Sequence, residues 1–315
     1  MVSRRYLRTK VMQGIFAFEA NVKEEINQGE KKLTASIESC YTLFCYFFSI
    51  FPEFKRYRLN KQEDLKGKIY PTFEDLNPNT KFVDNIVITQ IEDNVTLNKL
   101  WNQLSIHWND QSDFIVQIFQ EIAKCPAYIQ YLENPTRSYE DDKKLVLAII
   151  EDVFSQSEML HWYLEEKNVH WFDDYNEALL MVYKNISNFT EIKGINNKIT
   201  PLYKDSIEDV EFFKTLYRKT LIHGDSYSKM IESKLQNWEL ERIMGLDMIL
   251  MKMAICEFTE MPEIPIKVTI NEYIELAKMY SSTKSGLFIN GLLDKIVITL
   301  KEEGKLNKMG RGLIN

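Results

Sequence analysis

Residues 264–296, IPIKVTINEYIELAKMYSSTKSGLFINGLLDKI, predict two amphipathic helices joined by a polar turn. Thr269 and Glu272 have the spacing of a capping box, in which a hydroxyl and a carboxylate satisfy two otherwise unpaired amides at the start of a helix. On both sides of the turn, apolar residues recur at intervals of three and four, so each helix has one face to bury. These apolar residues are Ile270, Tyr273, Ile274 and Ala277, followed by Phe288, Ile289, Leu292, Leu293 and Ile296.

The same spacing extends through most of the chain. Leu7, Val11, Ile15 and Phe18 line one face of a first helix that Ser3 can cap. Further helices are expected over about 33–51, 86–107, 114–132, 206–232 and 237–258. The 315 residues include only 11 glycines and 8 prolines, about half the usual share. Because strand-rich folds need turns dense in both residues, the sequence predicts an all-α protein.

The longest apolar stretch, Tyr41–Phe51, precedes Pro52 and is shorter than the roughly 18 residues of a membrane span. We expect a buried or partner-covered helix there, no membrane anchor, and a cytoplasmic protein. A turn-rich stretch with Gly67, Pro71 and Pro78 follows, and Asn134-Pro135 breaks the helical pattern again. We therefore expect a domain boundary near residue 137, with one domain over 1–137 and another over 138–315.

Charge and motifs exclude several classes of function. The chain has 39 basic and 46 acidic residues, a net charge of −7, which excludes a uniformly cationic nucleic-acid binder. It contains no phosphate-binding glycine motif and no nucleophile elbow. Its four histidines have no metal-ligand spacing, and its four cysteines have apolar neighbours typical of reduced core residues. The expected protein is not an enzyme and holds no metal or cofactor.

One local cluster opposes the overall charge. Residues 1–10 contain Arg4, Arg5, Arg8 and Lys10 without any acid, and Arg4 and Arg8 lie one helical turn apart. Such a helix face can hold phosphates, because guanidinium is permanently charged and can donate two hydrogen bonds to phosphate oxygens. The alternative is a basic N-terminus that only contacts solvent.

Three stretches of a C-terminal signature and two upstream segments resemble the NusB family of transcription antitermination factors. The C-terminal segments IPIKVTINE (264–272), ELAK (275–278) and FINGLLDK (288–295) are similar to the family's signature. Asn237–Ile243, NWELERI, resembles its entry to a central helix, and Ser3–Arg8, SRRYLR, its arginine-rich first helix. The resemblance is close over about 3–20 and 207–297, loose over 138–206, and absent over 21–137.

This resemblance implies an all-α, NusB-like double helical bundle without catalytic activity. Family members bind boxA-type single-stranded RNA of ribosomal RNA leaders, pair with NusE, which is small-subunit ribosomal protein ten, and join an RNA polymerase complex. By the resemblance, Arg4, Arg5, Arg8 and Phe288 would contact RNA, and Lys284, in the turn before the last helix, could reach a phosphate. Phe288 could equally pack in the core, and Lys284 could be only solvated.

The stretch 21–137 departs from the family and is expected to be a helical insertion after the first helix. It is rich in aromatic residues, so it supplies either additional core or a surface for a partner. The alternative function is therefore a protein-only scaffold with the NusB fold that binds partners through residues 21–137. A ribosomal RNA methyltransferase with a related helical domain is not expected, because nothing like a cofactor-binding domain follows residue 297.

Overall fold

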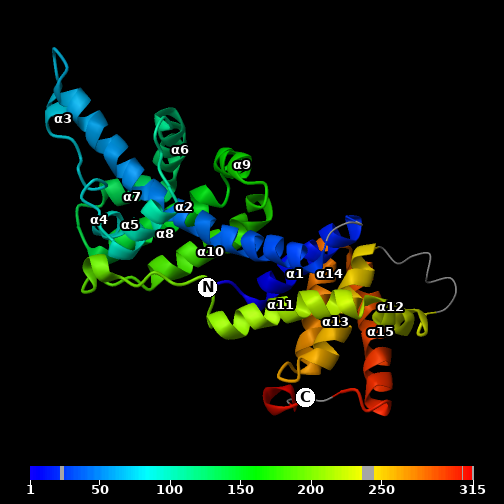
Figure 1. Ribbon diagram of the computed structural model, residues 1–315. Helices are drawn as coiled ribbons and strands as arrows, with labels where there is room; N and C mark the ends of the chain where they lie inside the picture. The colour runs from blue at the N-terminus through cyan, green and yellow to red at the C-terminus, as the bar shows by residue number, and fades with distance from the viewer. Residues whose placement is uncertain (22–24, 236–244, 307, 314–315) are drawn as a thin grey trace. The chain divides into compact units, whose positions relative to one another are not determined.

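Figure 1 shows the computed structural model of the chain, which describes residues 1–21, 25–235, 245–306 and 308–313. Over these residues the chain forms fifteen α-helices, one π-helical segment, η1, and two short 3-10 segments, without a strand. The all-α prediction is confirmed. The elements are α1 (Arg4–Ala20), α2 (Ile26–Lys66), α3 (Phe73–Leu76), α4 (Ile86–Glu92), α5 (Val95–Gln103), α6 (Ser112–Lys124), α7 (Pro126–Glu133), α8 (Tyr139–Ala148), η1 (Ile149–Phe154), α9 (Glu158–Lys167), α10 (Trp171–Ser187), η2 (Gly194–Asn196), α11 (Ser206–Ile222), α12 (Gly224–Glu232), α13 (Gly245–Glu260), α14 (Ile266–Tyr280), α15 (Thr283–Glu302) and η4 (Gly310–Leu313).

The chain divides into two compact units. Unit 1 comprises Met1 and Glu38–Leu202, and unit 2 comprises Val2–Ile37 and Tyr203–Asn315. Helix α2 belongs to unit 2 up to Ile37 and to unit 1 from Glu38 onward. The boundary expected near residue 137 thus falls inside unit 1, between α7 and α8. That residue 137 separates an added domain over 1–137 from a NusB-like domain over 138–315 stays a prediction.

Unit 1 is built on the aromatic half of α2. Phe44, Phe47, Phe48, Phe51 and Phe54 are at most 1% exposed, so the apolar stretch is a buried helix as expected. The helix nevertheless continues through Pro52, where the sequence predicted its end. A proline inside a helix loses one backbone hydrogen bond and costs roughly 3 kcal/mol. Burial of the phenylalanines on both sides of Pro52 offsets this cost, since each contributes about 1.5–3 kcal/mol.

Helix α2 is also long and apolar enough to cross a membrane, by its length and composition alone. In its most apolar 18-residue window, 56% is buried within the protein. Mostly buried core helices of soluble proteins meet the same two criteria, and the phenylalanines of this window pack against other rings of unit 1, such as Phe47 against Tyr175 at 5.1 Å.

Unit 2 has α13 at its centre. Ten residues of this helix are buried, and α13 contacts α1, α11, α12, α14 and α15 (Figure 1). Helices α14 and α15 form the predicted hairpin, and the Ser282 hydroxyl caps α15 by accepting a hydrogen bond from the Ser285 amide at 3.0 Å. The single helix expected over 206–232 is instead two, α11 and α12, which meet at His223.

The capping box expected at Thr269 and Glu272 is wrong. Helix α14 begins at Ile266, with Pro265 as its cap, so Thr269 lies inside the helix. Its hydroxyl is buried and donates to the carboxylate of Glu257 at 3.1 Å. The φ of Pro265 suits the start of a helix. Helix α14 therefore starts about one turn before the start that Thr269 and Glu272 predicted.

Candidate nucleic-acid interface

The arginine-rich start of the chain forms helix α1. The Ser3 hydroxyl accepts a hydrogen bond from the Tyr6 amide at 3.1 Å, which confirms the predicted cap. The three arginines of its first turns are not equivalent: Arg8 is buried, Arg4 is half-buried and Arg5 is exposed. Each of them faces a carboxylate from a different helix of unit 2.

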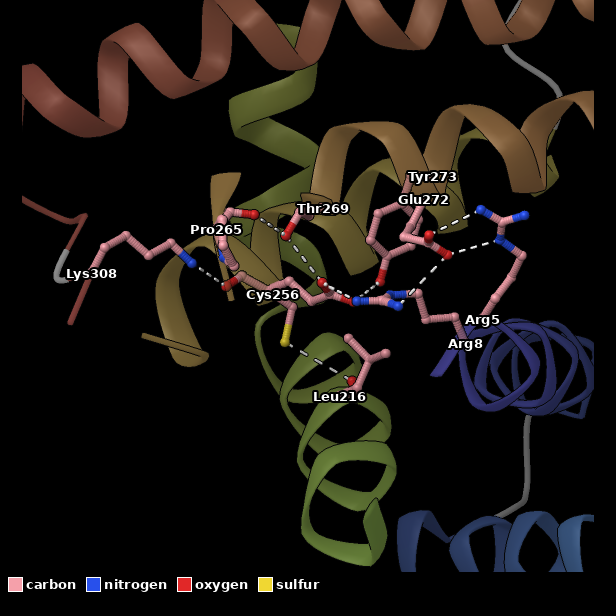
Figure 2. A network of polar contacts seen from close by, with 10 residues as sticks. Arg5, Arg8, Leu216, Cys256, Pro265, Thr269, Glu272, Tyr273 and Lys308 are labelled. Atoms are coloured by element: carbon pink, nitrogen blue, oxygen red, sulfur yellow. Dashed lines mark hydrogen bonds and ion pairs between the residues drawn. The ribbon is translucent and has the colours of Figure 1, made fainter. Parts of the chain in front are cut away.

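Arg8 forms a buried ion pair with Glu257 of α13 (Figure 2). Its Nε and Nη2 donate to the two carboxylate oxygens at 2.6 and 3.0 Å, and the two side chains are 3% and 0% exposed. Thr269 and Tyr273 of α14 donate their hydroxyls to the same carboxylate, at 3.1 and 2.8 Å. Every carboxylate oxygen therefore has two donors, as a buried charge requires.

The ionisation of this network follows from its burial. Burial opposes the charge of Arg8, but the charge and hydrogen bonds of Glu257 outweigh it, so the pKa of Arg8 is raised. Burial, reinforced by the negative charge of Glu257, raises the pKa of Tyr273 well above its usual value. Arg8 stays charged and Tyr273 stays a hydrogen-bond donor, which fixes α1 to α13 and α14 at any physiological pH.

Arg4 packs against α11. Its Nε lies 2.7 Å from Oδ1 of Asp209, and its guanidinium lies 4.4 Å above the ring of Phe212. Asp209 is only 7% exposed, but 39% of the Arg4 side chain contacts solvent. Its Nη2 lies 3.8 Å from the exposed carboxylate of Glu208, so Asp209 holds one edge of the guanidinium and a solvent-exposed ion pair occupies the other.

Arg5 is the most exposed of the three, at 44% of its side chain. It donates to both carboxylate oxygens of Glu272 on α14, at 2.8 and 2.9 Å. These hydrogen bonds raise the pKa of Arg5, against the effect of burial, and the charges of Glu272 and Glu275 add to the increase. Because the pair contacts solvent, an incoming phosphate can compete with Glu272 for the guanidinium.

The exposed charges continue from Arg5 along α14 to the start of α15. Glu275 is near Arg5, and its pKa is lowered by a 2.7 Å hydrogen bond from Lys278, by the charge of Lys278, and to a smaller extent by Arg5. Lys278 in turn packs on α15, since its Cγ lies 3.3 Å from the position that a Cβ at Gly286 would take. The first turn of α15 carries Lys284, which is exposed, and Phe288, which is half-buried.

Phe288 is thus not a core residue, although it shares a helix with the buried Ile289, Leu292 and Leu293. An aromatic ring that is partly exposed beside cationic groups suits stacking on an unpaired base. The geometry can therefore accommodate a single-stranded nucleic acid, with cations for its backbone and a ring for a base.

Sequence reasoning missed the partners of the arginines. Glu257, Asp209 and Glu272 come from helices about 200 residues or more away in the chain, and no local pattern links them to α1. It also missed Lys308, which donates to the backbone carbonyls of Glu257 and Met261 at 3.0 and 2.9 Å, at the end of α13. Burial lowers the pKa of Lys308 to about 8, against the attraction of Glu257. The motif over 237–243 lies outside the described residues.

Comparison with known proteins gives this helical fold its family. The family model described as "NusB family" matches residues 177–297, from within α10 to α15. A transcription antitermination protein NusB of Salinibacter ruber is 43% identical over 104 residues, which are 33% of this chain and 65% of that protein. The NusB of Chloroherpeton thalassium is 48% identical over 79 residues, or 25% and 37% of the two chains. That of Desulfatibacillum aliphaticivorans is 38% identical over 98 residues, or 31% and 68%.

The fold and the site define an all-helical protein whose arginine-rich first helix is held by ion pairs to a C-terminal helical core. Together with these relatives, they place the protein in the NusB family: the chain belongs to it. The matches span 65% and 37% of the first two relatives and leave residues 1–176 outside the family match. No solved structure matches the chain.

Proposed function

We propose that this protein is a transcription antitermination factor that binds boxA-type single-stranded RNA of ribosomal RNA leaders together with NusE and acts on RNA polymerase. The observation that carries the proposal is the exposed strip from Arg5 through Lys278 to Lys284 and Phe288. Membership of the NusB family supports it, since the three relatives described above are named transcription antitermination proteins. The proposed site of action is the cytoplasm, and no catalytic step is proposed.

The contacts divide by accessibility. Arg4, Arg5 and Lys284 are the proposed phosphate contacts, and Phe288 is the proposed stacking platform. At Arg4, a phosphate would replace the exposed carboxylate of Glu208. Arg8 was expected among the RNA contacts, but its guanidinium is occupied by Glu257 in the core. We assign it a positioning role, because its ion pair fixes the helix that presents Arg4 and Arg5.

The paired charges explain why a partner would be needed. Arg5 and Lys278 each lie against a carboxylate, and the whole chain carries a net charge of −7. A phosphate that binds Arg5 or Lys278 must first displace Glu272 or Glu275, and this displacement cancels part of the binding free energy of the contact. A basic partner such as NusE would contribute additional lysine and arginine contacts to the RNA phosphates. Such contacts dominate affinity because they release counterions from the RNA.

Fluorescence anisotropy with a boxA RNA and its scramble, with and without NusE, at two salt concentrations, tests the proposal. Changing Arg4 and Arg5 together to Ala should weaken boxA binding and make it less salt-dependent, by roughly one unit of the logarithmic slope per lost contact. Phe288→Ala should cost about 1–3 kcal/mol of affinity, the usual value of a base stack. Arg56→Ala, at an exposed ion pair with Glu53, is the matched control and should change nothing.

Glu272→Gln gives the sharper test, because it should strengthen RNA binding. The change leaves Arg5 in place but removes the carboxylate that neutralises it. Equal affinity of the wild type and Glu272→Gln, together with equal affinity for boxA and scramble in the presence of NusE, would refute the RNA role.

A second function remains open, a protein-only scaffold that works through residues 21–137. The observation that favours it is the segment after α2, where Ile69, Tyr70 and Phe73 are 79–90% exposed. The segment is ordered by a capping box at Thr72 and by an ion pair between Lys68 and Asp75 at 3.0 Å. Absence of boxA preference with NusE present would favour this function.

A further inference from the structure

The negative charge of the protein is concentrated in one short segment of unit 1. Residues 151–177 hold eight carboxylates and one lysine, which leaves 38 acidic and 38 basic residues in the rest of the chain. The net charge of −7 is therefore that of this segment. The segment comprises most of η1, all of α9 and the start of α10. Its last residue, Glu177, is the first residue of the family match.

Helix α9 carries much of this charge on one face. Leu160 and Leu164 are buried, and they turn the opposite face of the helix to solvent. Glu158, Trp162, Glu165 and Glu166 are spaced by four, three and one residues, so they form a continuous stripe on that face. Within the described part of the chain, none of these three glutamates forms an ion pair.

The single lysine of the segment does not neutralise the stripe. The ammonium of Lys167 lies 4.8 Å from the ring of Tyr163 and 5.8 Å from that of Tyr46. Tyr163 belongs to a stack with Phe114, at 4.0 Å between ring centroids, and with Trp108. Lys167 is thus directed to this aromatic stack on the inner side of α9.

Large apolar side chains lie within the acidic surface. Trp162 is 71% exposed, Val169 72% and Phe172 56%. His161, beside Trp162 in the chain, packs its ring on Phe172 at 5.2 Å, which links α9 to the start of α10. A tryptophan and a phenylalanine that remain exposed at the surface of one helix pair are typical anchors of protein interfaces.

We propose that this acidic aromatic patch, Glu158, Trp162, Glu165, Glu166, Val169 and Phe172, binds a lysine- and arginine-rich protein segment that inserts an apolar side chain against Trp162. Charge complementarity selects the partner: the carboxylates attract basic side chains and repel the phosphates of a nucleic acid. The aromatic residues supply the buried contact that charge alone does not give. This inference does not depend on RNA binding at α1 and α15.

Two synthetic peptides test the proposal with the full-length protein. One is a fluorescein-labelled 15-residue peptide of Lys and Arg with three Leu residues, and the other has the Leu residues replaced by Ser. The Leu peptide is expected to bind about tenfold tighter than the Ser peptide, because one leucine can bury its side chain against Trp162 and serine cannot. Trp162→Ala should abolish this difference, whereas the control Ile192→Ala, at a 99% exposed apolar residue of unit 1 outside the patch, should keep it.

Charge-reversing substitutions distinguish binding at the patch from a general effect of the protein's net charge. Glu165→Lys with Glu166→Lys should weaken both peptides tenfold or more at low salt. Glu63→Lys with Asp64→Lys makes the same change in net charge at two exposed neighbours on α2 and should have little effect. Equal weakening by both pairs, an unchanged preference for Leu in Trp162→Ala, or no binding of either peptide would overturn the proposal. So would a single-stranded oligonucleotide that competes for the patch.

Discussion

Replacement of Arg8 by Met should destabilise unit 2 strongly, although methionine fills most of the volume of the arginine stem. The change leaves the Glu257 carboxylate at 0% exposure with only the hydroxyls of Thr269 and Tyr273 as donors. Removing one partner of a buried ion pair typically costs about 3–5 kcal/mol, because the remaining charge stays desolvated. We expect a loss of this size for Arg8→Met.

Arg5→Met is the matched control. It is the same substitution on the same helix, and Arg5 also donates two hydrogen bonds to one glutamate. However, 44% of the Arg5 side chain contacts water, and an exposed pair contributes at most about 1 kcal/mol. Stability should therefore separate the two variants: Arg8→Met should lose it, whereas Arg5→Met should keep most of it and lose RNA affinity.

Native-state hydrogen exchange of the α13 and α14 amides is the suitable assay, because a global unfolding midpoint would mix the two units. For Arg8→Met, a loss of about 3–5 kcal/mol should speed exchange of the slowest amides by roughly two to three and a half powers of ten. For Arg5→Met, the change should stay below about one power of ten.

A double variant completes the test. Arg8→Met combined with Glu257→Met leaves no buried charge, so it should lose less stability than Arg8→Met alone, even though Thr269 and Tyr273 lose their acceptor. A double variant less stable than the single one, or an Arg8→Met protein with wild-type exchange rates, would refute the reasoning from desolvation.

Two further predictions concern glycines and cysteines. Gly29→Ala should destabilise unit 2 by about 1–3 kcal/mol, because its Cβ would clash with Oη of the buried Tyr217. Gly291→Ala, with open space around it, should stabilise α15 by up to about 1 kcal/mol. Native-state hydrogen exchange of unit 2 measures both changes, and the same sign for both would contradict the packing argument. Burial raises the pKa of the Cys45 and Cys256 thiols to about 12, so iodoacetamide at pH 8 should leave both unmodified in the native protein and alkylate both in urea, and rapid alkylation of the native protein would disprove their burial.

The sequence predicted features that depend on neighbouring residues. The Ser3 cap, the burial of residues 41–51 and the break before Pro135 all follow from local sterics and periodicity, and the structure has each of them. The turn between the last two helices was likewise predictable from its run of polar residues, and Ser282 caps the helix that follows.

The failures occur where distant residues decide. Pro52 predicted a helix end, but the aromatic core of unit 1 holds the helix together through it. Thr269 has the local signature of a cap, yet its hydroxyl serves a carboxylate on α13. Arg8 shows no difference from Arg5 in sequence, and only the fold reveals that one faces Glu257 in the core and the other faces solvent.

The division of unit 2 into two chain segments has a consequence for the order of synthesis. Unit 1 is continuous from Glu38 to Leu202, so it can fold as soon as these residues leave the ribosome. Helix α1 is made before unit 1, whereas its partners on α11, α13 and α14 are made after it. Arg8 and Glu257 are separated by 249 residues. At about 5–20 residues per second, roughly 12 to 50 seconds pass between the synthesis of the two. The arginines of α1 therefore have none of these carboxylate partners until Asp209, Glu257 and Glu272 have been synthesised.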